Sequence, residues 1–314
     1  MNAIRFIQNQ LILDNIPIPK PAKHEALLKV IQAGVCNTDL EIIKGYFSFT
    51  GTIGHEFVAL VEESDDPSLI GKRVVCDINC ACYQCTVCQQ GNFHHCPNRT
   101  VIGIVGKDGA FAQYLTAPIK NLFIIPSQVT NEKAVFVEPL AAALEIGEQI
   151  DLTQKKEALV FGDGKLGLLI ALSLEAQGVL VTLVGRHPER KKRFANTEIE
   201  YLLTPPDKTF GLVVEATGNP DGLELAISHT TPRGHLVLKS TYAESFSFNP
   251  SLLVVNEITL LGSRCGPFAK AIEFLEQGRV DPLGLIDERF SLLEGVAAIH
   301  KAQEKGVLKV LLDF

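Results

Sequence analysis

Short apolar runs separated by turn residues recur along the whole chain, but their spacing changes near residue 131. Before that point the runs are brief and alternate with prolines and glycines, which is typical of a domain built mostly from short strands. A loop that feeds a strand is predicted over 51–61, and a short helix within 34–45. Further strands are predicted over 4–7, 11–13, 26–31, 73–78, 111–116 and 122–125.

After residue 131 the pattern alternates between strand and helix. Helices are predicted over 132–150, 166–177 and 221–229. Six apolar runs have the length of strands: 158–161, 180–184, 201–203, 212–215, 235–239 and 258–261. Strands that alternate with helical crossovers predict a doubly wound parallel sheet, so the fold class is α/β. Helices over 268–277 and 292–304 and a strand over 308–314 lie outside this sheet.

Three glycines follow the strand 158–161 in the spacing G-x-G-x-x-G: Gly162, Gly164 and Gly167. The first permits a sharp turn, the second lets a pyrophosphate approach the backbone, and the third lets the next helix pack against the sheet. The start of that helix offers N–H groups and a positive dipole end to a phosphate. A plain strand-to-helix turn is the alternative. The residues expected to bind a dinucleotide here are Gly162, Gly164, Lys165, Leu166 and Gly167.

Composition narrows the class of protein. With 314 residues the chain is long enough for two domains, and 46% hydrophobic residues allow a sizeable core. The net charge of -7 argues against a nucleic-acid partner. The N-terminal residues show no signal peptide, and polar residues and a glycine interrupt the apolar stretch 166–184. A cytoplasmic protein without a membrane span is therefore expected.

Six of the eight cysteines are crowded into the segment 76–96, which favours metal binding over disulfides. Four thiolates this close in sequence can surround a zinc ion and leave no open position, so the site is expected to be structural. An iron–sulfur cluster is the rival interpretation. The four residues with the spacing C-x₂-C-x₂-C-x₇-C are Cys82, Cys85, Cys88 and Cys96.

Two details of this cysteine loop stay open in the sequence. Cys80 is a fifth cysteine that could replace Cys82, although the later four fit the spacing better. His94 and His95 lie within reach of the metal but are expected to be ordinary loop residues.

The chain resembles the zinc-containing medium-chain alcohol and polyol dehydrogenases over essentially its whole length. The resemblance is carried by GVCNTD (34–39), GHE (54–56), the cysteine loop, VEPLAAAL (137–144), GDGKLG (162–167) and KVLLDF (309–314). The motifs are closest to those of glucose, sorbitol and threonine dehydrogenases. The resemblance implies a GroES-like, mostly β catalytic domain over 1–145 and 266–314. It also implies a Rossmann dinucleotide-binding domain over 146–265 and an active site in the cleft.

The resemblance further implies a catalytic zinc site. Cys36 and His55 match the family's cysteine and histidine ligands, and Glu138 matches the third, where polyol and sugar dehydrogenases carry glutamate. Glu56 follows the histidine as a neighbour of the metal or an alternate ligand. A thiolate, an imidazole and a carboxylate leave an open position for a substrate oxygen, which zinc would polarise. Taken singly, Cys36 also fits a buried free cysteine, and His55 a loop histidine.

Thr38 lies where the family has a hydroxyl residue that passes on the alcohol proton. A hydroxyl suits this role because it both donates and accepts, but it also suits a helix cap. Many alcohol dehydrogenases end this relay with a histidine three positions later, where this chain has Glu41. The relay would then end through Glu41, a cofactor ribose hydroxyl or water. Tyr46, Phe47 and Phe49 are candidates either for the substrate pocket or for the core.

The end of the second strand of the Rossmann domain favours NADP over NAD. NAD enzymes usually place Asp or Glu there, on the ribose 2′-hydroxyl, but here Gly185 takes that position and Arg186 follows. Glycine leaves room for a 2′-phosphate and an arginine fork binds it, with Arg190 or Lys191 as a further charge. The basic run also fits a solvated helix face. The resemblance places Thr217 near the adenine or ribose and Lys309 near the pyrophosphate.

Two functions of different classes follow. The first is an NADP-preferring dehydrogenase with a catalytic and a structural zinc, which moves hydride between nicotinamide and a secondary alcohol, polyol or sugar. The second is a non-catalytic dinucleotide sensor or interaction protein whose only zinc lies in the cysteine loop. A zinc-free quinone reductase is disfavoured by the intact set Cys36, Thr38, His55 and Glu138. A homodimer or homotetramer is expected, with the run 258–261 as an edge strand between subunits.

Overall fold

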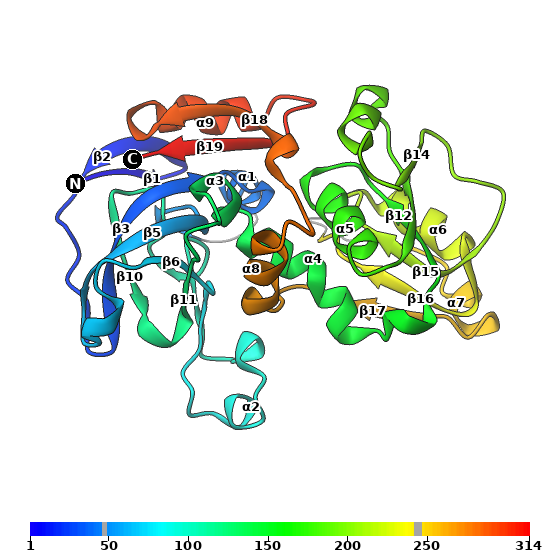
Figure 1. Ribbon diagram of the computed structural model, residues 1–314, viewed down its shortest axis with the longest axis horizontal. Coiled ribbons are helices and arrows are strands. Elements are labelled where there is room, and N and C mark those ends of the chain that lie inside the picture. The colour runs from blue at the N-terminus through cyan, green and yellow to red at the C-terminus, as the bar shows by residue number, and fades with distance from the viewer. Residues whose placement is uncertain (46–48, 242–246) are drawn as a thin grey trace. The chain divides into compact units, whose positions relative to one another are not determined.

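The computed structural model describes residues 1–45, 49–241 and 247–314. Tyr46 and Phe47 lie outside these residues. The chain divides into two units (Figure 1): unit 1 comprises Met1–Glu138 with Ile272–Phe314, and unit 2 comprises Pro139–Ala271. In the described ranges no helix combines the length and the apolar character that a membrane crossing needs.

Unit 1 is organised around a seven-stranded sheet with the order β11-β6-β5-β3-β19-β18, in which β10 also pairs with β3. β19 (Lys309–Asp313) runs antiparallel to β3 (Glu25–Gly34), so a segment from the C-terminal part of the chain lies inside the sheet (Figure 1). The remaining strands of this sheet are β5 (Glu56–Ser64), β6 (Arg73–Cys76), β10 (Tyr114–Pro118), β11 (Leu122–Ile124) and β18 (Ile286–Ser291).

Two small sheets complete the strands of unit 1, with the orders β2-β1-β4 and β7-β8-β9. Their strands are β1 (Asn2–Ile7), β2 (Gln10–Asn15), β4 (Gly51–Thr52), β7 (Asn79–Cys80), β8 (Thr100–Ile102) and β9 (Gly106–Lys107). The helices of unit 1 are α1 (Asn37–Ile43), α2 (Thr86–Gln89), α3 (Asn131–Ala134), α8 (Phe268–Glu276), which begins in unit 2, and α9 (Gly295–Ala302).

The core of unit 1 follows from the two-residue period of its central strands. Alternate residues of a strand project to the same face. Ala26, Leu28 and Val30 alternate along β3, and all three are buried in one apolar cluster. Phe57 on β5 joins the same apolar cluster, and so does Phe49, which is therefore a core residue. The strands that carry the candidate site are thus held by continuous apolar packing, which stabilises roughly in proportion to the area removed from water.

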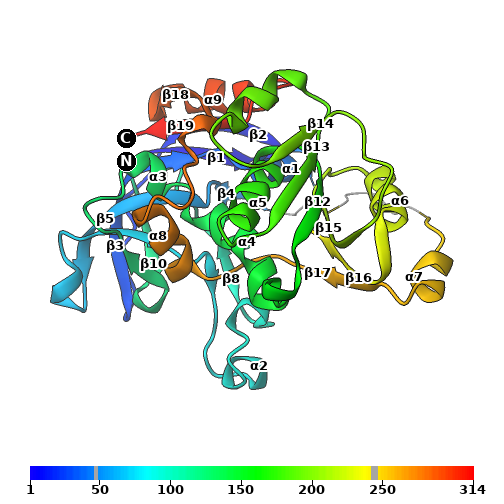
Figure 2. The same ribbon diagram turned by 45° about the vertical axis from the view of Figure 1, so that its right-hand side comes forward.

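Unit 2 contains a six-stranded sheet with the order β14-β13-β12-β15-β16-β17, and all of its pairs are parallel (Figure 2). The predicted doubly wound sheet is confirmed. Helix α5 packs on β12 and β13, and α6 packs on β15 and β16. The strands are β12 (Glu157–Phe161), β13 (Leu180–Val184), β14 (Glu200–Leu202), β15 (Phe210–Glu215), β16 (Thr230–Leu238) and β17 (Thr259–Gly262). The helices are α4 (Val137–Gln149), which begins in unit 1, α5 (Lys165–Glu175), α6 (Pro220–Ser228) and α7 (Ser251–Val255).

Several elements differ from the sequence prediction. The helix predicted over 132–150 is divided into α3 and α4, and the one predicted over 292–304 begins with a 3₁₀ turn before α9. A capping box between Ser291 and Glu294 accounts for that start. Strand β18 was not predicted because four of the six residues in its sequence IDERFS are polar and its side chains alternate between half-buried and exposed. Such an edge strand carries no apolar run.

Candidate functional site

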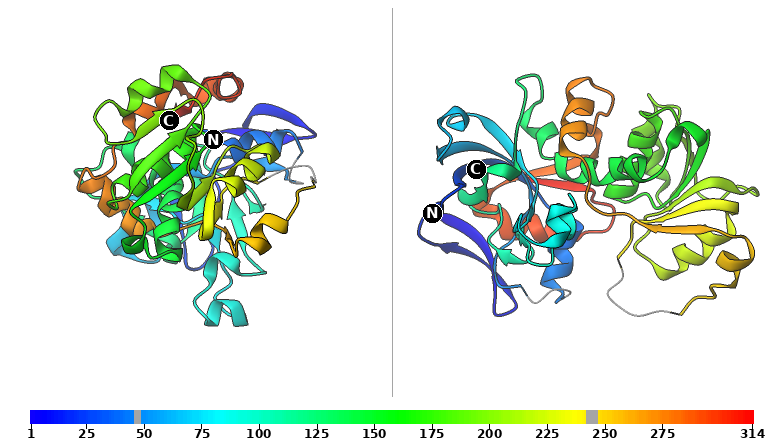
Figure 3. Two further views of the ribbon diagram at one scale, coloured as in Figure 1. Left: turned by 90° about the vertical axis from the view of Figure 1, so that its right-hand side faces the viewer. Right: turned by 90° about the horizontal axis from the view of Figure 1, so that it is seen from below.

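The four cysteines of the loop form a tight cluster in a lobe of unit 1, here called the cysteine lobe (residues 82–96; cyan in Figures 1 and 3). Their sulfurs all lie within 4.8 Å of one another. The Sγ of Cys96 is 3.5 Å from that of Cys82 and 3.8 Å from that of Cys85. These distances exceed a disulfide bond and match the edge of a tetrahedron around zinc, about 3.8 Å for Zn–S bonds of about 2.3 Å.

The chemistry of these donors also fits a zinc ion. The cluster contains Cys82, whereas Cys80 lies buried in β7 with its Sγ directed to the carbonyl of Ile78. Backbone N–H groups of Gln84 and Cys85 lower the pKa of Cys82 to about 6, and a thiolate is the form that binds metal.

Hydrogen bonds join the cysteine lobe to the body of unit 1. His94 Nε2 lies 2.7 Å from Asp77 Oδ2, and Tyr83 donates to Asn121 Oδ1 at 2.9 Å. Asn121 in turn donates to the carbonyls of Asp77 and Asn79. Burial raises the pKa of Asp77, but the bond to His94 outweighs it and leaves the pKa below its usual value. His94 therefore anchors the lobe and is not part of its metal-binding group.

A second cluster combines Cys36, His55 and Glu56, whose ligand atoms also lie within 4.8 Å of one another. Cys36 precedes α1, His55 lies between β4 and β5, and Glu56 begins β5. Asp39 joins these segments: it accepts the N–H of Cys36 at 2.8 Å and the N–H of Gly54 at 3.2 Å. Its Oδ1 also lies 3.1 Å from His55 Nδ1. The other ring nitrogen of His55 is therefore the one that can bind a metal.

The bend before His55 depends on glycine. Gly54 has φ +96°, in the left-handed region that favours glycine, and a Cβ at this residue would meet the ring of Phe111. Carbonyl oxygens of the same bend lie against Gly109, whose own Cβ would come within 2.6 Å of the Ile53 oxygen. The position of His55 is therefore set by close backbone packing.

Charges around the second cluster are balanced by a lysine from β19. Lys309 is buried and its Nζ bonds Glu56 Oε2. Burial raises the pKa of Glu138 to about 7, and the neighbouring Glu56 adds to this effect. Burial lowers the pKa of His55, but Asp39 and Cys36 raise it well above its usual value. Glu138 is thus close enough to interact with the cluster, but it is not a member of the tight group of three.

The two relay candidates occupy different surroundings on α1. The Thr38 hydroxyl lies 3.8 Å from the Cys36 sulfur, at the cluster. The Glu41 carboxylate lies one turn later, is partly exposed, and pairs with Lys44 at 2.9 Å. The structure therefore brings Thr38 to the cluster and directs Glu41 to Lys44.

The glycine turn of unit 2 has the geometry that its spacing suggests. Gly162 has φ +109°, and a Cβ there would lie 2.6 Å from the carbonyl carbon of Ala216. A Cβ at Gly167 would collide with the Gly162 carbonyl, whereas the space beside Gly164 is open. Helix α5 begins at Lys165, directly after Gly164. The first N–H groups of the helix therefore face a position that a phosphate can approach.

The room for a 2′-phosphate that the sequence predicts beside Gly185 is already filled. A Cβ at Gly185 would meet the Tyr201 hydroxyl and would lie 2.6 Å from the Cβ and Cγ of Asp163, so the glycine leaves no free room. Asp163 fills that space. Arg190 is also not an open charge, because it is buried and bonded to Asp163 through its guanidinium. Arg186 is the exposed cation at this strand end.

The remaining predicted cofactor residue, Thr217, follows β15 and already has partners. Its N–H and its hydroxyl both donate to the buried Glu215 at 2.6 Å. The sequence predicts Asp39 as a possible helix cap, but it does not reveal the contact of Asp39 with His55 or the roles of Asp163 and Glu215. Asp39 had a signal, since it follows Cys36 by three residues at the start of a helix. Asp163 and Glu215 had none beyond their places at the ends of predicted strands.

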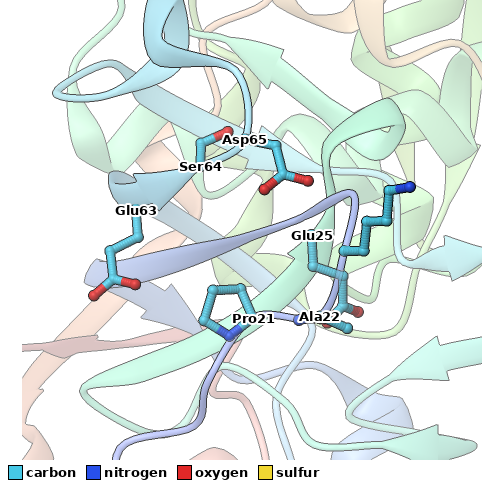
Figure 4. Close-up of a pocket in the computed structure, with 7 residues that line it drawn as sticks. Pro21, Ala22, Glu25, Glu63, Ser64 and Asp65 are labelled. Carbon is cyan, nitrogen blue, oxygen red and sulfur yellow. Dashed lines mark hydrogen bonds between the residues drawn. The ribbon is translucent and has the colours of Figure 1, made fainter.

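Unit 1 also has a surface pocket that is lined by none of the candidate site residues (Figure 4). It contains none of the cysteines, histidines or glycines named above, and Glu25 on its wall is bound by Lys107 at 2.6 Å. The side chains labelled in Figure 4 are Pro21, Ala22, Glu25, Glu63, Ser64 and Asp65. The carboxylates of the pocket belong to neither of the two close groups of metal-binding side chains found among the described residues.

Comparison with known proteins agrees with this geometry. The model of the alcohol dehydrogenase GroES-like domain matches residues 22–127. The starvation-sensing protein RspB of Escherichia coli (strain K12) is 29% identical, over 98% of this chain and 97% of its own. Sorbitol dehydrogenase of Bacillus subtilis (strain 168) is 26% identical, over 96% of this chain and 92% of its own.

A solved structure is similar over the whole chain. The NADP-bound crystal structure of a putative zinc-binding dehydrogenase from Sinorhizobium meliloti 1021 has a TM-score of 0.92 and 26% identity, and it covers 100% of this chain and 99% of that one. The predicted fold class, a GroES-like domain with a Rossmann-type parallel sheet, is confirmed.

Proposed function

We propose that this chain, which belongs to the zinc-type medium-chain alcohol and polyol dehydrogenases, is a zinc-dependent oxidoreductase that prefers NADP. The proposed reaction interconverts a secondary alcohol, polyol or sugar with its carbonyl compound. We further propose that unit 1 supplies the catalytic residues, that unit 2 binds the dinucleotide, and that the protein works in the cytoplasm as a homodimer or homotetramer.

The observation that carries this proposal is the group Cys36, His55 and Glu56, whose ligand atoms lie within 4.8 Å of one another. A thiolate, an imidazole and a carboxylate suit zinc, and three protein ligands are typical of catalytic sites, which keep one position open. Zinc bound there would supply Lewis acidity toward a substrate oxygen. Glu138, close by and with a pKa raised to about 7, is the residue we propose to exchange with Glu56 as third ligand.

The surrounding residues prepare this site. Asp39 holds the His55 ring in one orientation and fixes the backbone of Cys36, so two ligands are positioned before any metal arrives. Lys309 compensates the charge of buried Glu56, which would otherwise be costly to keep ionised. Thr38, beside the Cys36 sulfur, is the group we propose to take the proton of the substrate hydroxyl and pass it toward solvent or the cofactor ribose.

In unit 2 we propose that the backbone from Gly162 to Gly167 binds the pyrophosphate. The proposed preference for NADP rests on Arg186, an exposed cation directly after Gly185 at the end of β13. Thr217 and Lys309 are proposed as further cofactor contacts.

The decisive test is the absorbance of reduced nicotinamide with zinc-loaded protein, NADP or NAD, and a panel of secondary alcohols, polyols and sugars. We expect turnover with NADP and a polyol or sugar. Turnover with NAD alone would keep the enzyme and overturn the cofactor preference. Binding of cofactor without turnover of any substrate, at one zinc per chain, would favour a dinucleotide sensor instead.

A further inference from the structure

The C-terminal end of β13 holds a buried network centred on Asp163. This residue lies in the glycine turn, but its carboxylate reaches the end of the neighbouring strand. Its Oδ2 accepts the N–H groups of Arg186 and His187 at 3.2 and 3.1 Å, and the Tyr201 hydroxyl at 2.7 Å. His187 Nδ1 lies 3.0 Å from the same oxygen, and Arg190 lies 3.3 Å from Oδ1.

The carboxylate occupies the space of a missing side chain. In dinucleotide-binding domains an acid at the end of the second strand faces the ribose 2′-hydroxyl and rejects a 2′-phosphate. Here that position is Gly185, and Asp163 atoms stand 2.6 Å from where its Cβ would be. The negative charge has therefore not left the ribose end of the strand; it comes from the glycine turn.

Arg190 offsets the negative charge of Asp163. It is 5% exposed, and its guanidinium bonds both the carboxylate and the backbone carbonyl of Asp163. Burial raises the pKa of Asp163, but Tyr201 and Arg190 outweigh it and lower the pKa, so the carboxylate stays ionised. The pair is close to neutral, whereas either partner alone would present a full charge in a poorly solvated place.

We infer that Asp163 and Arg190 together set the preference between a 2′-hydroxyl and a 2′-phosphate on the cofactor. This inference rests on the proposed dinucleotide site of unit 2. Asp163 disfavours the phosphate, Arg190 cancels that effect, and the exposed Arg186 then tips the balance toward NADP. In this arrangement Arg190 acts through Asp163 and does not itself contact the phosphate.

The test compares adenosine 2′,5′-bisphosphate with 5′-AMP by calorimetry on the zinc-loaded full chain, at about pH 8, where an ordinary imidazole is neutral. The measured quantity is the ratio of the two affinities, which needs no turnover. Asp163→Asn removes the carboxylate charge that faces Arg190 and should raise the preference for the bisphosphate about tenfold. Arg190→Gln leaves the carboxylate without its partner and should lower that preference about tenfold.

Matched variants separate this role from a structural one. Arg190→Lys and the double variant Asp163→Asn/Arg190→Gln should stay within about threefold of the original ratio, and so should the exposed charge controls Lys192→Gln and Asp207→Asn. A merely structural network would weaken both ligands together, so shifts of both single variants in the same direction, or of neither, overturn the inference. If Arg190→Gln does not fold, the other two variants provide the test. A raised ratio in Asp163→Asn together with an unchanged ratio in Arg190→Lys supports the inference. Any other result overturns the inference. If the original protein binds neither nucleotide, the dinucleotide proposal fails and this inference fails with it.

Discussion

The two groups of metal-binding side chains in unit 1 are built in opposite ways. The cysteine lobe takes all four donors from the segment 82–96, and its own turns bring the sulfurs together. The group of Cys36, His55 and Glu56 takes its donors from two separate segments and its charge balance from Lys309 on β19. A local group of four thiols encloses a metal, whereas an assembled group of three leaves a position for substrate. The difference predicts that loss of a donor from the group of Cys36, His55 and Glu56 lowers turnover, whereas loss of a donor from the cysteine lobe lowers stability.

The largest expected effect on turnover comes from Cys36→Ser. Loss of a thiolate ligand should remove the metal that polarises the substrate, so kcat should fall about a thousandfold or more. The melting temperature should change little, because Cys36 is partly exposed at a helix start. Steady-state rates together with zinc content test this. Unchanged turnover at one zinc per chain would show that the assembled group is not the catalytic centre.

Asp39→Asn should have the next largest effect. The amide keeps the shape of the side chain but weakens its hold on His55 and on the N–H of Cys36. Loss of such a partner of a ligand typically lowers metal affinity or activity about 10- to 100-fold. Zinc titration with a competing chelator measures the first, and initial rates measure the second. Affinity and rate both within twofold of the original protein would contradict the role assigned to Asp39.

Cys85→Ser should reverse the pattern. The cysteine lobe should lose its zinc, so the content should fall from two ions per chain to one and the melting temperature should drop clearly. The molecules that remain folded should keep turnover within about threefold, because no donor of the other group changes. Thermal melting and metal analysis on the same sample check this. A thousandfold loss of kcat at unchanged zinc content would mean that the two groups are not independent.

The smallest effect is expected from Glu41→Gln. Its carboxylate pairs with Lys44 at the surface of α1, and exposed ion pairs contribute little. Turnover should therefore change by less than about twofold, and the pH profile of kcat should keep its shape. Thr38→Ala is the matched comparison on the same helix and should slow turnover much more. Equal losses in the two variants would return Glu41 to the proton relay.

The fold could be predicted from the sequence more completely than the candidate site could. The parallel sheet of unit 2 was predictable because its buried strands are apolar runs between helices, while β18 was not, because an edge strand with charged residues has no such run. The four-cysteine group of the cysteine lobe could be predicted from the spacing of its residues alone. The place of Lys309 beside Glu56 could not, because it depends on the pairing of β19 with β3 across most of the chain.

The error at Gly185 has the same origin. A sequence shows that a side chain is missing at one strand end, but it does not show that a residue 22 positions earlier fills the space. Tertiary contacts of this kind follow only from the order of the strands, and β12 and β13 are neighbours in the sheet. The local pattern therefore predicted the strand end to which we assign the cofactor preference, but not the residues that we propose to set it.

The place of β19 inside the sheet of unit 1 has a consequence for synthesis on the ribosome. Unit 2 draws all its strands from one continuous stretch, so it can fold as soon as that stretch has emerged. Unit 1 must wait until residue 313 has been translated, because the C-terminal end of β3 still lacks β19 and Glu56 still lacks its lysine. While the last part of the chain, from residue 272 on, is being translated, the nascent chain therefore carries a complete unit 2 and an incomplete unit 1. During that interval a chaperone that covers the exposed edge of β3 has its greatest opportunity to act.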